Sequence, residues 1–167
     1  MNAIINHSKY NLNGKSAIIT GGGGLLGPEH ATSLARWGAK VILLDIEDKG
    51  LEAGCKRVID KLPNCSINGY NVDITDEEQL LALLHKLQGE GIEIDILVNN
   101  ACLNPKMDSF EQDKSGTVEG YNMDVWNAEI QVGITGTFLC CKVFGSKMAE
   151  RGGGSIVNVA SDLAIQA

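Results

Sequence analysis

Short apolar runs rich in β-branched residues alternate along this chain with longer segments of helical periodicity. A strand, a helix and a second parallel strand form a right-handed unit. Repeats of that unit build a parallel sheet with helices on both faces. We therefore expect a single doubly wound α/β domain over residues 1–167, whose sheet ends after a fifth strand. The expected strands are 15–20, 41–45, 66–72, 95–99 and 155–159.

The segments between the expected strands carry apolar or small residues at helical spacing. Thr75 and Glu78 have the spacing of a capping box and predict the start of the third helix. The apolar positions of the first three helices are Gly27, Ala31, Leu34, Ala35 and Gly38; Leu51, Cys55, Val58 and Leu62; and Leu80, Leu83, Leu84 and Leu87.

A long helix is predicted over residues 124–150, and from Val132 to Val143 it is apolar on nearly all sides. This pattern predicts burial both by the sheet and by a neighbouring subunit, so we expect a homo-oligomer. If strand 155–159 is a sheet edge, its backbone groups are unpaired on one side. Ile134, Phe138 and Val143 would then be exposed without a covering element, which favours association.

Composition and charge exclude several classes of function. The 167 residues include 14 Lys and Arg against 21 Asp and Glu, a formal net charge of −7, and this balance disfavours nucleic acids and anionic membranes. No apolar stretch is long enough to span a membrane, and the first 15 residues do not resemble a secretory signal. Five cysteines without CxxC spacing indicate neither a metal site nor a disulfide framework, so a cytoplasmic location is expected.

A glycine-rich segment, Gly21 to Gly27, joins the first expected strand to the first helix. Gly22, Gly24 and Gly27 satisfy GxGxxG, whereas Gly21, Gly24 and Gly27 satisfy TGxxGxxG. Glycines permit the tight turn and let a pyrophosphate approach the backbone, while the helix N-terminus offers unpaired N–H groups. A merely flexible turn is the alternative, but the strand before and the helix after favour a dinucleotide site of the Rossmann type.

Asp45 ends the second expected strand, 18 residues after Gly27. A carboxylate there can accept hydrogen bonds from both ribose hydroxyls and would repel a 2′-phosphate. No Arg or Lys occurs from Leu44 to Asp48, so NAD is predicted over NADP. The alternative is an ordinary solvated acid at a strand end.

These features and several further motifs resemble the short-chain dehydrogenase/reductase family. Asn99-Asn100-Ala101 is similar to its NNAG motif, residues 10–15 resemble its lead-in to the first strand, and residues 156–161 resemble the strand that carries the catalytic serine. The resemblance implies strand order 3-2-1-4-5, a nicotinamide cofactor and an alcohol or carbonyl substrate, with sugars and other hydroxylated compounds as candidates. It assigns the catalytic role to Ser161. It implies cofactor contacts by Gly21, Gly23, Gly24, Leu26, Asp45, Ile46, Asp73, Ile74, Asn99 and Ala101, with Asp73 near the adenine.

The chain also departs from the family's pattern. Leu25 stands where TGxxxGxG has its middle glycine, and Gly133 stands where relatives usually carry an asparagine of a proton relay. The family's Tyr-x-x-x-Lys pair, whose tyrosine moves the hydroxyl proton, occurs nowhere in the 167 residues. We therefore expect a domain truncated at its C-terminus and inactive alone. Two interpretations stay open: an NAD-dependent oxidoreductase whose sequence continues past Ala167, and a non-catalytic nucleotide-binding module.

Four further features are weaker candidates. Cys102 replaces the glycine of NNAG, and a small buried residue is favoured over a reactive thiolate. His30 has no second ligand at metal spacing, which indicates a structural role. Asp162 could point into a substrate cleft or be a solvated acid. The polar segment 103–122, with Lys106, Asp108, Glu111 and Asp113, lies where substrate specificity would be set.

Overall fold

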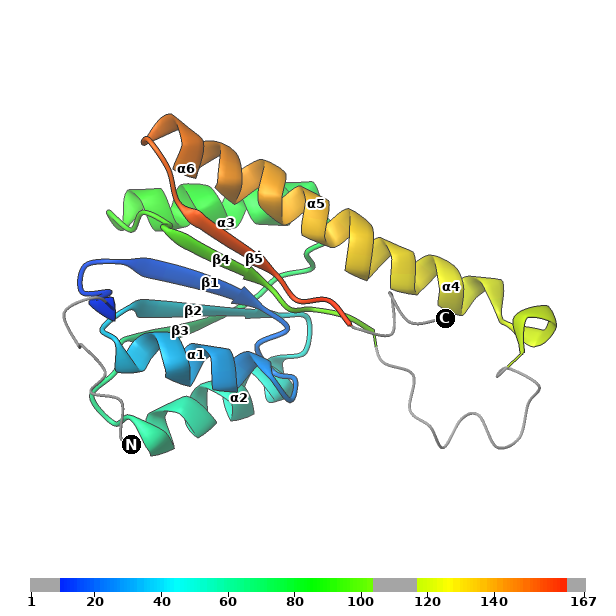
Figure 1. The fold of residues 1–167 in the computed structure, drawn as a ribbon, viewed down its shortest axis with the longest axis horizontal. Coiled ribbons are helices and arrows are strands. Elements are labelled where there is room, and N and C mark those ends of the chain that lie inside the picture. Colours follow the sequence, from blue (N-terminus) through cyan, green and yellow to red (C-terminus); the bar gives the residue numbers. More distant parts are fainter. Residues whose placement is uncertain (1–9, 104–116, 162–167) are drawn as a thin grey trace, which may run out of the picture.

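The computed structural model describes residues 10–103 and 117–161 and contains a five-stranded parallel sheet. The strand order is β3-β2-β1-β4-β5, as the family resemblance implied. Within the described residues, β3 and β5 are the two edges of the sheet (Figure 1). The strands are β1 Ser16–Thr20, β2 Lys40–Asp45, β3 Ile67–Asn71, β4 Ile96–Asn99 and β5 Ser155–Asn158.

Helices cover both faces of the sheet, which confirms the doubly wound α/β prediction (Figure 1). Helices α1 (Gly27–Arg36) and α2 (Asp48–Lys61) lie on one face. Helix α3 (Glu77–Gly89) and the long helical segment that precedes β5 lie on the other. Side chains of the strands alternate between the two layers, so Ile19 and Leu43 join the core under α1 and α2, and Ile18 and Ile42 join the opposite core.

The long helical segment runs from Met123 to Glu150, close to the expected range. It consists of α4 (Met123–Ile130), α5 (Thr137–Cys140) and α6 (Ser146–Glu150), linked by π-helical turns at Gln131–Gly136 and Cys141–Gly145. Figure 1 shows its first half projecting beyond the sheet, whereas its second half packs beside α3.

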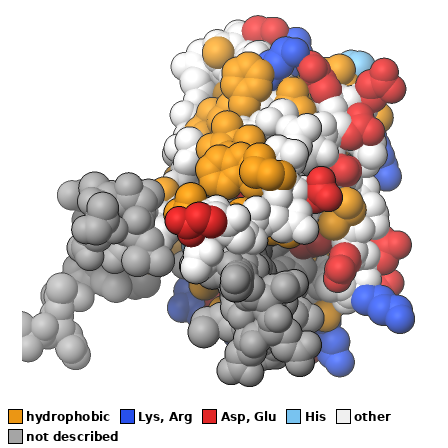
Figure 2. Space-filling view, turned by 90° about the vertical axis from the view of Figure 1, so that its right-hand side faces the viewer, with side chains coloured by type: hydrophobic (Ala, Val, Ile, Leu, Met, Phe, Trp, Pro, Cys, Tyr) orange, Lys and Arg blue, Asp and Glu red, His pale blue; other side chains and the backbone are white. Residues whose placement is uncertain are grey.

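The exposure of apolar side chains on this helix agrees only in part with the expectation from the sequence. Ile134 and Phe138 are 64% and 63% exposed, as expected. Val143 is only 5% exposed, and the expectation of an exposed side chain there is wrong because it faces the core between α3 and the sheet. Seen from the side on which α4 projects, hydrophobic side chains gather in a band, with acidic side chains along one flank (Figure 2).

The start of α3 differs from the predicted capping box. The N-cap is Asp76, not Thr75, and its Oδ1 accepts hydrogen bonds from the N–H groups of Glu78 and Gln79. Gln79 Nε2 also donates to Asp76 Oδ2 at 3.0 Å, and this bond, with those backbone bonds, holds the pKa of Asp76 below its ordinary value. The Thr75 hydroxyl donates instead to Asp73 Oδ1, because the chain has turned one residue later than the motif predicts.

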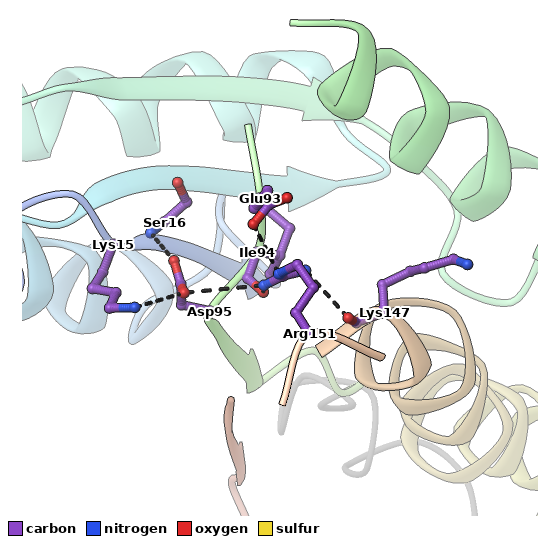
Figure 3. Close-up of polar contacts among 7 residues, drawn as sticks. All are labelled: Lys15, Ser16, Glu93, Ile94, Asp95, Lys147 and Arg151. Atoms are coloured by element: carbon purple, nitrogen blue, oxygen red, sulfur yellow. Dashed lines mark hydrogen bonds and ion pairs between the residues drawn. The ribbon is translucent and has the colours of Figure 1, made fainter. Parts of the chain in front are cut away.

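A polar network fastens the amino ends of the strands (Figure 3). Asp95 Oδ2 accepts from Ser16 N–H at 3.0 Å, and Asp95 Oδ1 accepts from Lys15 Nζ at 3.0 Å. Arg151, just after α6, donates to the Ile94 carbonyl and pairs with Glu93 at 2.9 Å. The network ties the end of α6 to the amino ends of β4 and β1, at the end of the sheet opposite to the glycine loop.

Candidate functional site

A cavity of about 500 Å³ lies where the carboxyl ends of the parallel strands meet. The chain passes to one side of β1 through β2 and β3 and to the other side through β4 and β5, so the strand order reverses here. Open α/β sheets bind ligands in the crevice at such a reversal. The lining residues are Gly21, Gly24, Leu25, Leu26, Leu44, Asp45, Ile46, Glu47, Val72, Asp73, Ile74, Asn100, Ala101, Cys102, Leu103 and Val132.

The glycine loop between β1 and α1 is tightly folded. Gly21 has φ +69°, a conformation that other residues rarely adopt, and its carbonyl accepts from Gly24 N–H at 3.2 Å. A Cβ at Gly27 would lie 2.3 Å from the same Gly21 carbonyl oxygen. These two positions therefore require glycine, which agrees with the spacing found in the sequence.

Helix α2 packs directly on this loop through two glycines of its own. A Cβ added at Gly54 would lie 2.2 Å from the carbonyl oxygen of Gly22. A Cβ added at Gly23 would lie 2.6 Å from the carbonyl carbon of Gly50. The backbone of the loop and the backbone of α2 are thus in contact, and this contact supports the loop from the side away from the cavity.

Asp45 joins the end of β2 to the glycine loop. Its Oδ2 accepts from Gly23 N–H at 2.8 Å, and its Oδ1 accepts from Glu47 N–H at 3.1 Å. Each carboxylate oxygen has a further lone pair, so the group can accept two more hydrogen bonds at the cavity. The two backbone bonds fix its orientation, which suits it to a pair of neighbouring hydroxyl groups.

The loop also offers unpaired donors. Gly22 N–H is bonded to the Leu44 carbonyl, and the N–H groups of Gly23 and Gly24 are bonded as described above. In the described part of the chain, no hydrogen bond uses the N–H of Leu25 or of Leu26, the N-cap residue of α1. Unpaired N–H groups at a helix N-terminus form a binding site for an anion such as a phosphate.

Asp73 and Ile74 lie at the rim beyond β3. Asp73 Oδ1 accepts from the N–H and the hydroxyl of Thr75, at 2.8 and 2.7 Å, while its N–H donates to Gln79 Oε1. No described hydrogen bond uses Asp73 Oδ2, which leaves one acceptor for a ligand. Ile74, which is buried, adds an apolar wall to the cavity.

The end of β4 is clamped to the end of β1. The Thr20 hydroxyl accepts from the N–H groups of Asn100 and Ala101, both at 3.0 Å, and Asn100 Nδ2 donates to the Thr20 carbonyl at 2.9 Å. Asn99 is 4% exposed and turns away, donating to Asn158 Oδ1 of β5 at 2.8 Å. Sequence reasoning missed Asn100 as a lining residue, although its place beside Asn99 was a usable signal.

The structure brings most of the predicted cofactor residues to one cavity. Gly21, Gly24, Leu26, Asp45, Ile46, Asp73, Ile74 and Ala101 line it. Gly23 contributes through its bond to Asp45, whereas the Asn99 side chain lies between β4 and β5. Ser161 is exposed, three residues beyond the end of β5. These residues' roles stay predictions.

Cys102 is exposed and lines the cavity, so the favoured buried position is wrong. The chain leaves the end of β4 at that point, and no helix among the described residues buries its side chain. His30 lies on α1 outside the cavity lining, and Gly133 has open space where a side chain would begin. Asp162, Lys106, Asp108, Glu111 and Asp113 lie outside the described residues.

Two kinds of feature are absent from residues 10–103 and 117–161. No group of three or more His, Cys, Asp and Glu side chains there is placed to hold a metal ion. No helix among the same residues has the length and apolar character needed to cross a membrane.

Comparison with known proteins gives the same family as the motifs. A family model described as short chain dehydrogenase matches residues 15–167. The D-threitol dehydrogenase of Mycolicibacterium smegmatis is 30% identical over 155 residues, which are 93% of this chain and 55% of that protein. The levodione reductase of Leifsonia aquatica is 31% identical over 144 residues, 86% of this chain and 51% of the relative. The chain thus spans about half the length of the curated relatives it matches.

Solved structures agree in fold. A levodione reductase aligns with a TM-score of 0.80 at 29% identity, and the alignment covers 94% of this chain and 58% of the levodione reductase chain. An NAD⁺-bound xylitol dehydrogenase aligns with a TM-score of 0.78 at 29% identity, covering 93% and 56%. A gluconate 5-dehydrogenase from Burkholderia cenocepacia, in complex with NADP and tartrate, aligns with a TM-score of 0.80 at 25% identity, covering 96% and 59%.

Proposed function

This chain belongs to the short-chain dehydrogenase family of oxidoreductases, which bind nicotinamide cofactors, and we propose that its cavity binds NAD in preference to NADP. We further propose that the whole protein transfers a hydride between NAD and an alcohol or carbonyl compound. Sugars and related polyols are the favoured substrate class, because D-threitol dehydrogenase and xylitol dehydrogenase are among its relatives.

The observation that carries the proposal is the placement of Asp45 between the glycine loop and the cavity. Its carboxylate is held by Gly23 N–H with lone pairs to spare, which suits the two ribose hydroxyls of NAD. The 2′-phosphate of NADP would bring negative charge against this carboxylate and against Glu47, which also lines the cavity. Residues from Gly24 to Leu26 suit the pyrophosphate, and Asp73 and Ile74 suit the adenine.

The residues of this chain would bind and orient, whereas NAD when bound would accept or supply the hydride. Ser161 would orient the substrate oxygen through its hydroxyl. A serine has no suitable pKa for moving the hydroxyl proton, and the sequence contains no Tyr-x-x-x-Lys pair. The 167-residue chain alone is therefore expected to bind cofactor without turning over an alcohol.

A non-catalytic nucleotide-binding module is the second candidate, and Gly133, which has no side chain to take part in a proton relay, favours it. Both candidates require the same cofactor cavity. The reading frame of the encoding gene past Ala167 discriminates them, since a downstream Tyr-x-x-x-Lys would favour the enzyme. The expected homo-oligomer and the cytoplasmic location stay part of this proposal.

Calorimetric titration of the purified chain with NAD⁺ and NADP⁺ tests the cofactor assignment. A unit charge pair at close range in water is worth about 1 kcal/mol, and a 2′-phosphate carries more than one charge. We expect NAD⁺ to bind about 10-fold more tightly than NADP⁺. Asp45→Ala should narrow this ratio, while Asp60→Ala, which removes the same charge from an exposed position of α2, should leave it unchanged. Equal affinities for the two cofactors would remove Asp45 from the ribose site.

A further inference from the structure

Arg57 reaches from α2 to the outer side of the glycine loop. Its Nη2 donates to the Gly24 carbonyl at 2.6 Å and to the Leu25 carbonyl at 3.3 Å. The side chain is half-buried, and its Nε is buried without a hydrogen-bond partner among the described residues. No carboxylate of the described residues pairs with it, in contrast to Lys61 one turn further on, which pairs with Glu29 at 2.6 Å.

The contacts of Arg57 with the two carbonyls fix the direction of the N–H groups that follow them. A trans peptide is planar, so its carbonyl oxygen and the N–H of the next residue point in opposite directions. The Gly24 carbonyl points at Arg57, and the Leu25 N–H therefore points away from it. The Leu25 carbonyl also meets Arg57, and the Leu26 N–H points away in the same manner. No described hydrogen bond uses either of these two N–H groups.

We propose that Arg57 is a positioning residue that orients the Leu25 and Leu26 N–H groups toward the pyrophosphate of a bound dinucleotide. This inference rests on the proposed function, because it concerns how the same cavity binds the pyrophosphate of the dinucleotide. The guanidinium holds both carbonyls with one nitrogen and polarises both peptide groups, which strengthens their N–H groups as donors. Its positive charge behind the loop adds to the potential that the α1 N-terminus already provides for an anion.

A purely structural role for Arg57 makes a different prediction. If Arg57 only supports the packing of α2, its removal would weaken every ligand of the cavity alike. If it orients the phosphate donors, its removal would weaken ligands with a pyrophosphate and spare those without one. ADP and adenosine differ in this respect alone, so the ratio of their affinities separates the two roles.

The experiment compares the wild-type chain with Arg57→Met, Arg57→Lys and the control Lys61→Met, each titrated with ADP and adenosine and followed by amide NMR. Charge-assisted hydrogen bonds are strong enough that Arg57→Met should weaken ADP binding about tenfold, with adenosine binding unchanged. Arg57→Lys, which keeps the charge but not the planar fork, should lie between. Lys61→Met should change neither affinity, although it removes the same charge from the same helix.

Amide NMR spectra of the ligand-free variants give a second measurement that needs no ligand. Loss of the guanidinium frees the Gly24 and Leu25 peptides, so the Leu25 and Leu26 resonances should shift and broaden in Arg57→Met but not in Lys61→Met. Equal weakening of ADP and adenosine, or unchanged ADP affinity in a folded Arg57→Met, would overturn the inference while leaving the proposed function intact. A wild-type chain that binds neither ADP nor NAD⁺ would overturn both.

Discussion

Replacing Gly54 of α2 by alanine should separate local helix propensity from the contact between α2 and the glycine loop. Gly54 is buried, and the added Cβ would lie 2.2 Å from the Gly22 carbonyl oxygen and 3.2 Å from its carbonyl carbon. A backbone oxygen cannot move away as the end of a flexible side chain can. The loop and α2 must therefore separate to accommodate one methyl group.

The expected magnitude follows from two opposing effects. Within a helix, Gly→Ala normally stabilises by about 0.5–1 kcal/mol. Overpacking of a tight contact costs about 1–3 kcal/mol, so the net free energy of unfolding should fall by about 1 kcal/mol. Gly133→Ala is the matched control, because it lies in the long helix with no atom within 4 Å of the added Cβ. The free energy of unfolding of Gly133→Ala should therefore rise by the full helix-propensity difference, about 0.5–1 kcal/mol.

Thermal unfolding followed by circular dichroism measures the stability of both variants, and NAD⁺ titration measures the binding competence of the loop. We expect the melting temperature of Gly54→Ala to fall by about 2–4 °C and that of Gly133→Ala to rise. NAD⁺ affinity should drop in Gly54→Ala only, since the displaced loop carries the N–H groups that we propose bind the pyrophosphate. If Gly54→Ala is as stabilising as Gly133→Ala, α2 does not rest on the loop and the reasoning fails.

Three further outcomes are expected. Burial raises the pKa of Asp95, but the bonds from Ser16 and Lys15 and the charge of Arg151 outweigh it and hold that pKa below its ordinary value. The resulting stabilisation is present above about pH 4 and is lost as the pH falls. Asp95→Asn should therefore lower the melting temperature at pH 7 and much less at low pH; an equal loss at both would contradict this. Sedimentation should show that the chain self-associates through the exposed Ile134 and Phe138. The double variant Ile134→Lys/Phe138→Lys should be a monomer, whereas the control Ile59→Lys on α2 should still associate. A monomeric wild-type chain would refute this prediction. NADH formation from polyols by the 167-residue chain should be undetectable, and robust turnover at the intact mass of 17.8 kDa would reveal another acid or base.

The sheet and most of the cavity were predictable because their signals are local. Runs such as 41–44 are apolar on both faces, as is typical of a strand that is covered on two sides. The glycine spacing and Asp45 lie within one strand–helix–strand unit. The strand order came from the family resemblance rather than from periodicity, since pairing between distant strands leaves little trace in a single sequence.

What the sequence did not reveal depends on contacts between distant residues. Arg57 and Gly54 contact the loop across more than 30 positions of the chain, and nothing in α2's own pattern marks that contact. Val143 was expected to be exposed because an all-apolar helix does not show which face meets the core. Asp76 caps α3 in place of Thr75 because both residues can cap, and the turn at Asp73 decides between them.

Mapping amide chemical shifts of the chain during addition of NAD⁺ tests the central claim most directly. The account predicts shifts in Leu25, Leu26, Asp45 and Ile74, which surround the cavity at the carboxyl ends of the strands. Shifts centred instead on the amino ends of the strands, around Asp95, or no saturable shifts at all, would contradict it.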